Sequence, residues 1–390
     1  MKKSKNSQNN LNIILPWFSN EGTWNEGRTF QKVAEHLSLL PQVKQVIVTF
    51  SPTRNQLDFN HPLKINRLSN KLALVTANTS IVPVDGYGFR ARKLLNKLSN
   101  NYALSSYLRL LGFRKNNTIL WTFPPNKYID DYINNIPHTH LIGHIVDNFL
   151  EHNDPWLKQA ASHQYPLLIE KANLLIVGSQ FNKAFFSQNR NDVYCIENAV
   201  DEDFIAEPSA LPLTKDRPVT LGYIGTLSER TDHDLLSFIA KERPDWNIII
   251  AGKTEIALEA LPWTGVDNID YRGVLPYKSL PKLMATFDVC LIPHKDTTYS
   301  ESMSPLKLFQ YLASGRPIVS TNIEGINTFK HLIRVASSTN DFISEIENTL
   351  NTDTIEQSYL RINAAKAHTW EKAIQSMFEL VEHSLSRSNT

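Results

Sequence analysis

The residues of greatest chemical interest lie in one segment, Ser304–Pro317, which reads SPLKLFQYLASGRP. Ser304 is expected to be the N-cap of a helix, with Pro305 at the first helical position. Lys307 then lies in the first turn, where the helix dipole disfavours a cation. A bound phosphate would stabilise a lysine there, because backbone N–H groups at a helix start also attract anions. The segment therefore predicts a phosphate site, and an ordinary capped helix with a solvated lysine is the alternative.

The same helix carries an amide one turn further on. Gln310 follows Lys307 by three residues, close enough for both side chains to face one ligand. A side-chain amide at this place can hydrogen-bond the hydroxyl pair of a ribose. Gly315 is expected to end the helix. Together these residues favour a site for a nucleotide over a site for phosphate alone.

A glycine turn in the second half of the chain is a further candidate for phosphate binding. The strand expected at residues 219–224 runs into Gly225 and Thr226, and Asp232 opens the next helix. Gly225 lets the backbone approach a ligand closely, and N–H groups at the helix start favour an anion. With Lys307, the turn predicts a diphosphate site. A plain turn with Asp232 as the N-cap is the alternative.

The first half offers a histidine and an aspartate at the end of one strand. His144 lies near the end of the apolar run at residues 140–146, and Asp147 directly follows that run. Open α/β sheets bind ligands beyond the carboxyl ends of their strands. Asp147 could bind or polarise a hydroxyl group. His144 could shuttle a proton, because an imidazole titrates near neutral pH. A structural histidine is the alternative.

Short β-branched runs alternate with helical patterns along the chain, which is typical of βαβ units with parallel sheets. Strands are expected at residues 11–16, 43–50, 118–123, 140–146, 174–177, 192–196, 219–224, 246–250, 269–271, 288–292 and 317–320. The chain has 390 residues, more than one hydrophobic core normally supports, so two doubly wound α/β domains are expected. A proline-containing stretch without periodicity is expected to link them. The predicted organisation is a disordered basic tail at residues 1–10, a first domain at 11–200, the linker at 201–217, a second domain at 218–368 and a helix at 369–390.

Charge and cysteine content exclude several classes of function. The 40 Lys and Arg residues nearly balance the 39 Asp and Glu residues, so no net field favours nucleic acid. Both cysteines lie in apolar runs, which argues against a disulfide framework or a zinc site. No apolar window is long enough to span a membrane. A cytoplasmic protein is expected, and peripheral association with the inner membrane face stays open.

Two Asp-x-Asp segments, at residues 201–203 and 232–234, are candidates for metal binding. The first lies in the expected linker and the second at a helix start. Neither follows a strand in the way that an aspartate pair for a metal–diphosphate complex would. No metal and no other cofactor is therefore expected.

The segment at residues 304–317 resembles the donor-binding motif S-P-x-K-L-x-E-Y-x-A-x-G-x-P-V-V of glycosyltransferases of the GT-B fold, of the family 4 or glycosyl transferases group 1 type. Other landmarks follow in the family's order. Residues 198–201 resemble its Asn-Gly-Val-Asp hinge, residues 222–236 its glycine turn, and residues 368–371 the start of its final helix. The resemblance covers roughly residues 140–385 and is strongest to the subgroup of teichuronic-acid biosynthesis.

This resemblance implies a GT-B fold, with two Rossmann-like domains facing a central cleft and a last helix that crosses back to the first domain. It places a nucleotide-sugar co-substrate on the second domain. The implied donor-binding residues are Gly225, Thr226, Arg230, Ser304, Pro305, Lys307, Leu308 and Gln310. In the first domain, Arg28 and Gly22 are implied to lie beside the diphosphate or the acceptor, and a surface arginine near a helix start is the alternative.

Two positions depart from the family pattern. The glutamate that holds the ribose in the family is Gln310 here, and a neutral amide binds a hydroxyl less strongly than a carboxylate does. The family's other glutamate falls at Ser302, with Glu301 one position away. Glu301 or Ser302 could take its place if the loop shifts.

The resemblance implies a glycosyltransferase that moves a sugar from a UDP- or GDP-linked donor to a hydroxyl of a cell-surface polysaccharide, glycolipid or glycan. It further implies a metal-independent reaction that retains the anomeric configuration. Asp147 and His144 are the candidate catalytic residues. Two alternatives stay open: a GT-B nucleotide-sugar epimerase, and a non-catalytic nucleotide-sugar-binding or scaffold protein derived from a transferase.

Overall fold

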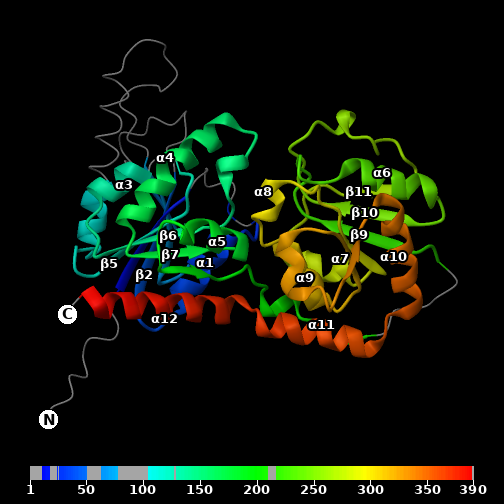
Figure 1. Cartoon of the computed structure of the whole chain (residues 1–390). Coiled ribbons are helices and arrows are strands. Elements are labelled where there is room, and N and C mark those ends of the chain that lie inside the picture. The colour runs from blue at the N-terminus through cyan, green and yellow to red at the C-terminus, as the bar shows by residue number, and fades with distance from the viewer. Residues whose placement is uncertain are drawn as a thin grey trace. The chain divides into compact units, whose positions relative to one another are not determined.

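The computed structural model describes residues 11–17, 24, 26–50, 63–77, 104–126, 129–209 and 217–388. The chain divides into two compact units. The first contains Met1–Gly178, Asn182–Ile196 and Ile374–Thr390, and the second contains Ser179–Phe181 and Glu197–Ala373. Each unit is built on one sheet with helices packed against it (Figure 1). The expected tail at residues 1–10 lies outside the described residues, as do residues 210–216 of the expected linker.

The sheet of the first unit has eight strands within the described ranges, in the order β3-β4-β2-β1-β5-β6-β7-β8. They are β1 (Leu11–Pro16), β2 (Val43–Phe50), β3 (Leu63–Arg67), β4 (Leu72–Ala77), β5 (Thr118–Thr122), β6 (His140–Ile145), β7 (Leu174–Val177) and β8 (Val193–Cys195). Neighbouring strands are parallel except β3, which pairs antiparallel with β4 at one edge. The strand order reverses between β1 and β5, so their carboxyl ends flank a topological switch point.

Helices and buried side chains cover both faces of this sheet. Ile14 and Ile47 belong to the hydrophobic cluster that includes Tyr165, whereas Ile13 and Val46 are buried on the opposite face. Helices of this unit include α1 (Thr29–Leu39), α3 (Ile129–Asn135), α4 (Pro155–Lys171) and α5 (Gln180–Ser187), with the 3-10 helix η2 (Phe149–Glu151). The last helix, α12 (Trp370–Ser388), begins in the second unit and belongs to the first from residue 374 on.

The sheet of the second unit has six parallel strands in the order β11-β10-β9-β12-β13-β14 across the part of the chain that is described. They are β9 (Thr220–Ile224), β10 (Asn247–Ala251), β11 (Ile269–Tyr271), β12 (Val289–Ile292), β13 (Ile318–Thr321) and β14 (Arg334–Ala336). β9 pairs with β10 on one side and with β12 on the other. The chain first builds outward from β9 through β10 to β11 and then returns to β12, so the switch point lies between β9 and β12.

Side chains of β9 alternate between two hydrophobic clusters on the two faces of this sheet. Leu221 and Tyr223 join a cluster with side chains of α6 (His233–Glu242) and α10 (Thr339–Thr352). Ile224 joins the cluster that includes α7 (Leu280–Met284) and α9 (Leu306–Ser314). Residue 222 must be a glycine because the ring of Phe287 packs onto the strand there, and a Cβ would lie 2.0 Å from that ring. Helices on both faces confirm the predicted doubly wound α/β class.

The remaining helices of the second unit include α11 (Ile355–Ala367) and α8 (Thr298–Glu301), and the 3-10 helices are η3 (Glu202–Phe204), η4 (Leu258–Ala260), η5 (Tyr277–Ser279) and η6 (Glu324–Phe329). Strands predicted at residues 11–16, 43–50, 174–177 and 269–271 have these bounds in the structure. The other individually predicted strands differ by one residue at one or both ends.

Among the described helices, none is long and apolar enough to cross a membrane.

Candidate functional site

The candidate site lies at the carboxyl edge of the second sheet, at the switch point between β9 and β12. Gly225 directly follows β9, and His294 comes two residues after β12. Helix α9 begins after the loop that continues from His294. Ligands of open α/β sheets bind in the crevice at this edge, so the topology places the predicted glycine turn and the start of α9, together with His294, where a ligand is expected.

Gly225 and Lys307 lie directly against each other. Gly225 has a φ of +146°, and a Cβ on it would lie 2.9 Å from Cε and 3.1 Å from Nζ of Lys307. The lysine side chain therefore passes over the bare backbone of the glycine turn. The two elements from which the sequence predicts a diphosphate site therefore lie in contact in the structure.

Among the described residues, the Lys307 ammonium has polar partners but no counter-ion. Its Nζ donates to the Tyr223 hydroxyl at 2.9 Å, lies 4.2 Å from the centre of the Tyr223 ring and contacts Nε2 of His294 at 2.9 Å. Within the described ranges no carboxylate forms an ion pair with Lys307. Burial lowers the pKa of Lys307, and the nearby Arg230 guanidinium lowers it further. A cation in this setting is suited to bind an anion.

The start of α9 differs by one residue from the prediction. Pro305, not Ser304, is the N-cap residue, and no side chain caps the helix. The Ser304 hydroxyl instead accepts a hydrogen bond from the Asn198 N–H at 3.1 Å, and the Asn198 amide donates to the Ser304 carbonyl at 2.6 Å. The helix start is thus free of a side-chain cap, which suits an anion at its N–H groups. Gly315 ends the helix with a φ of +68°, as predicted.

Arg230 lies near the same cluster, on the loop that leads from β9 to α6. Its guanidinium carbon is 4.7 Å from the centre of the Tyr299 ring, and its Nη1 is 2.9 Å from Sδ of Met303. The positive charge contributes to lowering the pKa values of Lys307 and His294, so Arg230 is close enough to act on an anion bound there.

Gln310 and Leu308 have different environments on α9. Gln310 is only 5% exposed, and no hydrogen bond to its amide occurs among the described residues, which leaves this amide available to a ligand. Leu308 is fully buried in the hydrophobic cluster of this face, and its N–H already donates to the Pro305 carbonyl. The Leu308 side chain therefore packs in the core, and its implied donor-binding role stays a prediction. Thr226 is half-buried, and its carbonyl accepts from the Tyr223 hydroxyl at 3.0 Å.

Glu301 and Ser302 also differ in exposure. The Ser302 side chain is fully buried, its hydroxyl donates to the Tyr299 carbonyl at 2.9 Å, and its carbonyl accepts from Ser179 Oγ at 2.8 Å. Ser302 is therefore a structural residue in this conformation. Glu301 is half-buried at the end of α8. Burial raises the pKa of its carboxyl group, and the negative charges of Asp296 and Glu324 raise it further. Of the two candidates, Glu301 has the more exposed side chain, and its role stays a prediction.

In the first unit, His144 lies near the carboxyl end of β6 and is 1% exposed. The Trp121 Nε1–H donates to His144 Nδ1 at 3.3 Å, and the Phe123 ring lies 4.8 Å from the imidazole, centre to centre. Burial lowers the pKa of His144 to about 3. The ring is therefore neutral at pH 7, with its proton on Nε2. This environment disfavours the predicted proton shuttle and favours the structural alternative.

Asp147 and Arg28 occupy loop and helix-start positions of the first unit. Asp147 is half-buried beyond β6, and its carbonyl accepts from the Tyr165 hydroxyl at 3.0 Å. Arg28 is the residue before α1, and its Nε forms an ion pair with Glu26 at 2.6 Å. Gly22 lies outside the described residues. The roles of these residues stay predictions.

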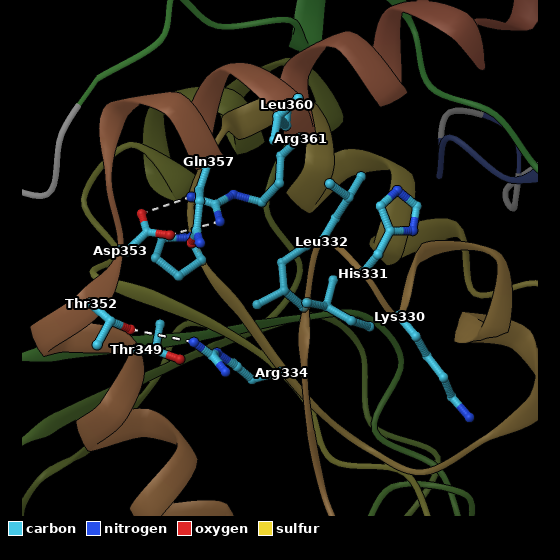
Figure 2. A pocket seen from close by; sticks show the side chains of 13 residues that line it. Lys330, His331, Leu332, Arg334, Thr349, Thr352, Asp353, Gln357, Leu360 and Arg361 are labelled. Carbon is cyan, nitrogen blue, oxygen red and sulfur yellow. Dashed lines mark hydrogen bonds and ion pairs between the residues drawn. The ribbon is translucent and has the colours of Figure 1, made fainter.

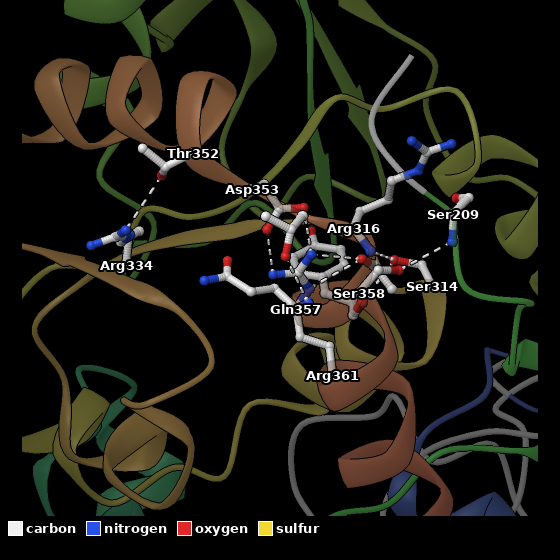
Figure 3. A network of polar contacts seen from close by, with 12 residues as sticks. Ser209, Ser314, Arg316, Arg334, Thr352, Asp353, Gln357, Ser358 and Arg361 are labelled. Carbon is white, nitrogen blue, oxygen red and sulfur yellow. Dashed lines mark hydrogen bonds and ion pairs between the residues drawn. The ribbon is translucent and has the colours of Figure 1, made fainter. Parts of the chain in front are cut away.

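A cavity of about 270 Å³ lies elsewhere in the second unit, between the starts of β13 and β14 and the helices α10 and α11 (Figure 2). One wall is the Arg361 guanidinium, which donates to both carboxylate oxygens of Asp353 and, twice, to the Gly315 carbonyl (Figure 3). Arg361 and Asp353 are each 3% exposed. Because the Arg361 guanidinium bonds both the Asp353 carboxylate and the Gly315 carbonyl, this side of the cavity joins α11 to the end of α9.

Two residues of the candidate site were not singled out from the sequence. Tyr223 reads as one more apolar residue of a buried strand, and its hydroxyl is revealed only by its contact with Lys307. His294 could have been found, because it follows the carboxyl end of a predicted strand, where ligand-binding residues of parallel sheets lie.

The two doubly wound sheets have the GT-B architecture, as the solved structures similar to the chain show. Residues 218–352 match the family described as Glycosyl transferases group 1. The chain is 25% identical over 195 residues to a protein of Bacillus subtilis (strain 168) described as a teichuronic acid biosynthesis glycosyltransferase, TuaH. The match covers 46% of this chain and 48% of TuaH, so the chain spans about half the length of this curated relative. The predicted family resemblance is thereby confirmed.

Two solved structures illustrate the fold. HepE from Anabaena, in complex with UDP and glucose, is similar with a TM-score of 0.65 at 14% identity, covering 96% of this chain and 100% of that one. The catalytic domain of starch synthase IV from Arabidopsis thaliana, bound to ADP and acarbose, has a TM-score of 0.65 at 10% identity, covering 97% and 100%. Both likenesses concern the fold alone.

Proposed function

We propose that the protein is a glycosyltransferase that moves a sugar from a nucleoside-diphosphate sugar to an acceptor hydroxyl. The observation that carries this proposal is the position of Lys307. A cation with no ion-pair partner among the described residues lies over the Gly225 turn, at the switch point of a doubly wound sheet, and the nearby N-cap residue Pro305 makes no side-chain cap hydrogen bond. This combination fits a diphosphate.

The chemistry requires charge stabilisation on the leaving group. The bond between the anomeric carbon and the diphosphate oxygen breaks, the acceptor oxygen bonds to the anomeric carbon, and the acceptor proton leaves to a base or to solvent. The nucleoside diphosphate departs with added negative charge. Lys307, the N–H groups at the start of α9 and Arg230 would stabilise that charge through preorganised contacts. Lys307 and Arg230 supply fixed positive charge, so the proposed reaction is metal-independent, and retention of configuration follows the family analogy.

We propose a UDP- or GDP-linked donor, with the ribose held by the Gln310 amide. Support for uridine comes from the similar solved structures, among them HepE in complex with UDP and glucose. The TuaH likeness supports a cell-surface polysaccharide or glycolipid as the acceptor. Such an acceptor would place the protein in the cytoplasm, with peripheral association at the inner membrane face. Asp147 is proposed to bind or polarise the acceptor hydroxyl.

A panel of nucleotide sugars with a crude glycolipid acceptor tests the activity by release of nucleoside diphosphate. The proposal predicts release that depends on the acceptor for at least one donor, and its loss in Asp147→Ala. Glu170→Ala, which removes an exposed carboxylate of α4, should leave the rate unchanged. Donor binding without turnover would favour a non-catalytic protein, the alternative that Gln310 keeps open. Interconversion of the donor sugar without any acceptor would instead indicate an epimerase.

A further inference from the structure

His294 has a fixed position at the switch point. Its N–H donates to Oγ1 of Thr321 at 3.1 Å, and Oγ1 of Thr321 donates to the His294 carbonyl at 2.7 Å. On its other side, His294 forms an antiparallel bridge with Thr231. The residue is 4% exposed. The Thr321 hydroxyl of β13 and the backbone of the loop after β9 therefore hold the His294 backbone and limit where its imidazole can lie.

The contact with Lys307 determines the tautomer of this imidazole. An ammonium has only donors, so Nε2 of His294, 2.9 Å from Lys307 Nζ, must accept the hydrogen bond. The ring is then neutral, with its proton on Nδ1. Nδ1 is buried and has no hydrogen-bond partner among the described residues. Buried donors without a partner are rare in native proteins and call for an explanation.

The explanation lies in a closed ring of contacts around the Gly225 turn. Lys307 Nζ donates to the Tyr223 hydroxyl, which lies 3.2 Å from Oγ1 of Thr231. Thr231 is bridged to His294, which accepts from Lys307. The ammonium is thus held from β9 by Tyr223 and from the end of β12 by His294. Two of its three donors are engaged by neutral acceptors, and the third is left for an anion.

We propose that His294 is a positioning residue for the donor, which holds the Lys307 ammonium over Gly225 in the orientation that binds the diphosphate. This inference rests on the proposed function. A long lysine side chain loses rotamer freedom when it binds a ligand, and an ammonium held in place beforehand avoids part of that loss. Because both acceptors are neutral, they orient the cation without cancelling its charge. The unpaired Nδ1 is the cost of presenting Nε2 to the lysine.

The test compares His294→Phe, which has no acceptor, with His294→Gln, whose side-chain oxygen can replace Nε2. Calorimetric titration with the nucleoside diphosphate that the wild-type chain binds best should show about tenfold or greater weakening for His294→Phe. His294→Gln should keep most of the affinity. Binding of the matching nucleoside, which has no phosphate, should be the same in all variants, whereas a general packing defect would weaken both ligands. If His294→Phe does not fold, His294→Asn, whose shorter side chain cannot reach Nζ, replaces it.

A double-mutant cycle with Lys307→Met separates positioning from structure. If His294 acts through Lys307, His294→Phe should have no further effect on affinity once Lys307 is Met. If His294→Phe lowers the affinity equally in the wild-type chain and in Lys307→Met, the inference is overturned. It is also overturned if His294→Phe keeps wild-type affinity while Lys307→Met binds more weakly. Both outcomes leave the proposed donor site intact. Unaltered binding in Lys307→Met contradicts the proposed function itself.

Discussion

The side chain of Lys307 lies against the backbone of Gly225, so close that any side chain at residue 225 would collide with it. A Cβ there would be 2.9 Å from Lys307 Cε, a distance that real Cβ contacts do not show. The glycine and the lysine come from segments more than eighty residues apart. The lysine side chain passes over the backbone of the glycine, and together the two residues define the proposed diphosphate site.

Gly225→Ala should weaken nucleoside diphosphate binding because the new methyl group displaces the Lys307 ammonium. It should also destabilise the fold by about 1–3 kcal/mol, since a φ of +146° is unfavourable for alanine. Gly265→Ala is the matched control: its φ is +79°, but apart from its chain neighbours no described residue has an atom within 4 Å of the added Cβ. The control should lose stability and keep its affinity in calorimetry. Equal affinity losses in the two variants would show that strain alone, and not the lysine contact, is responsible.

Gln310→Glu should raise the affinity for a nucleoside diphosphate and lower the stability of the free protein. The carboxylate would accept a charge-assisted hydrogen bond from a ribose hydroxyl. Without ligand, it would be buried at a side chain that is now 5% exposed and unpaired in the described part of the chain. The comparison uses uridine diphosphate and its 2′,3′-dideoxy analogue. A gain confined to the ribose-containing ligand supports the assignment, and a gain for both or for neither contradicts it.

Arg361→Met should destabilise the second unit by about 3–5 kcal/mol, because it leaves the buried Asp353 carboxylate without its partner. It also removes both hydrogen bonds to the Gly315 carbonyl at the end of α9. Urea denaturation followed by tryptophan fluorescence measures the loss. The double variant Asp353→Leu/Arg361→Met should be more stable than Arg361→Met alone, since no buried charge remains.

The control for that experiment is an ion pair at the surface. Asp245→Ala removes a carboxylate that is 61% exposed and pairs with Arg243, and it should cost at most about 1 kcal/mol. If Arg361→Met loses no more unfolding free energy than Asp245→Ala does, the buried ion pair does not stabilise the fold as its geometry indicates.

His144 should make the stability of the fold depend on pH. Its pKa is lowered from 6.5 to about 3 in the native state, so between these values the unfolded chain binds more protons. Stability is then fully present above pH 6.5 and falls on acidification, by up to about 1.4 kcal/mol per pH unit. His144→Asn, whose side-chain oxygen can still accept from Trp121, should show a shallower slope between pH 7 and 5. Replacing the exposed His383 by Asn should leave the wild-type slope, and identical slopes in all three proteins would contradict the burial of a neutral His144.

The buried strands and the glycine–lysine site were predictable from the sequence for local reasons. Strands covered on both faces read as continuous apolar runs, so β2 and β7 have their predicted bounds. Lys307 stands out because it breaks the usual charge preference of a helix start. Gly225 stands out because a glycine follows a strand and precedes a helix.

The features that escaped prediction depend on distant contacts. Ser304 has the sequence of an N-cap, but Asn198, more than a hundred residues earlier, binds its hydroxyl and carbonyl. His144 reads as a titrating histidine until Trp121 and the surrounding burial make it neutral. The pairing of His294 with Lys307 requires the strand order of the second sheet, which spacing alone does not determine.

The most direct test of the account is calorimetric titration of the wild-type chain and of Lys307→Met with uridine, guanosine and deoxythymidine diphosphates. We expect that at least one of these ligands binds the wild-type chain, and that the variant binds that ligand roughly 10- to 150-fold more weakly because it has lost a hydrogen bond from a charged donor. Affinity that does not change on loss of the ammonium, or no binding of any of the three by the wild-type chain, would contradict a nucleotide-sugar site at Gly225 and Lys307.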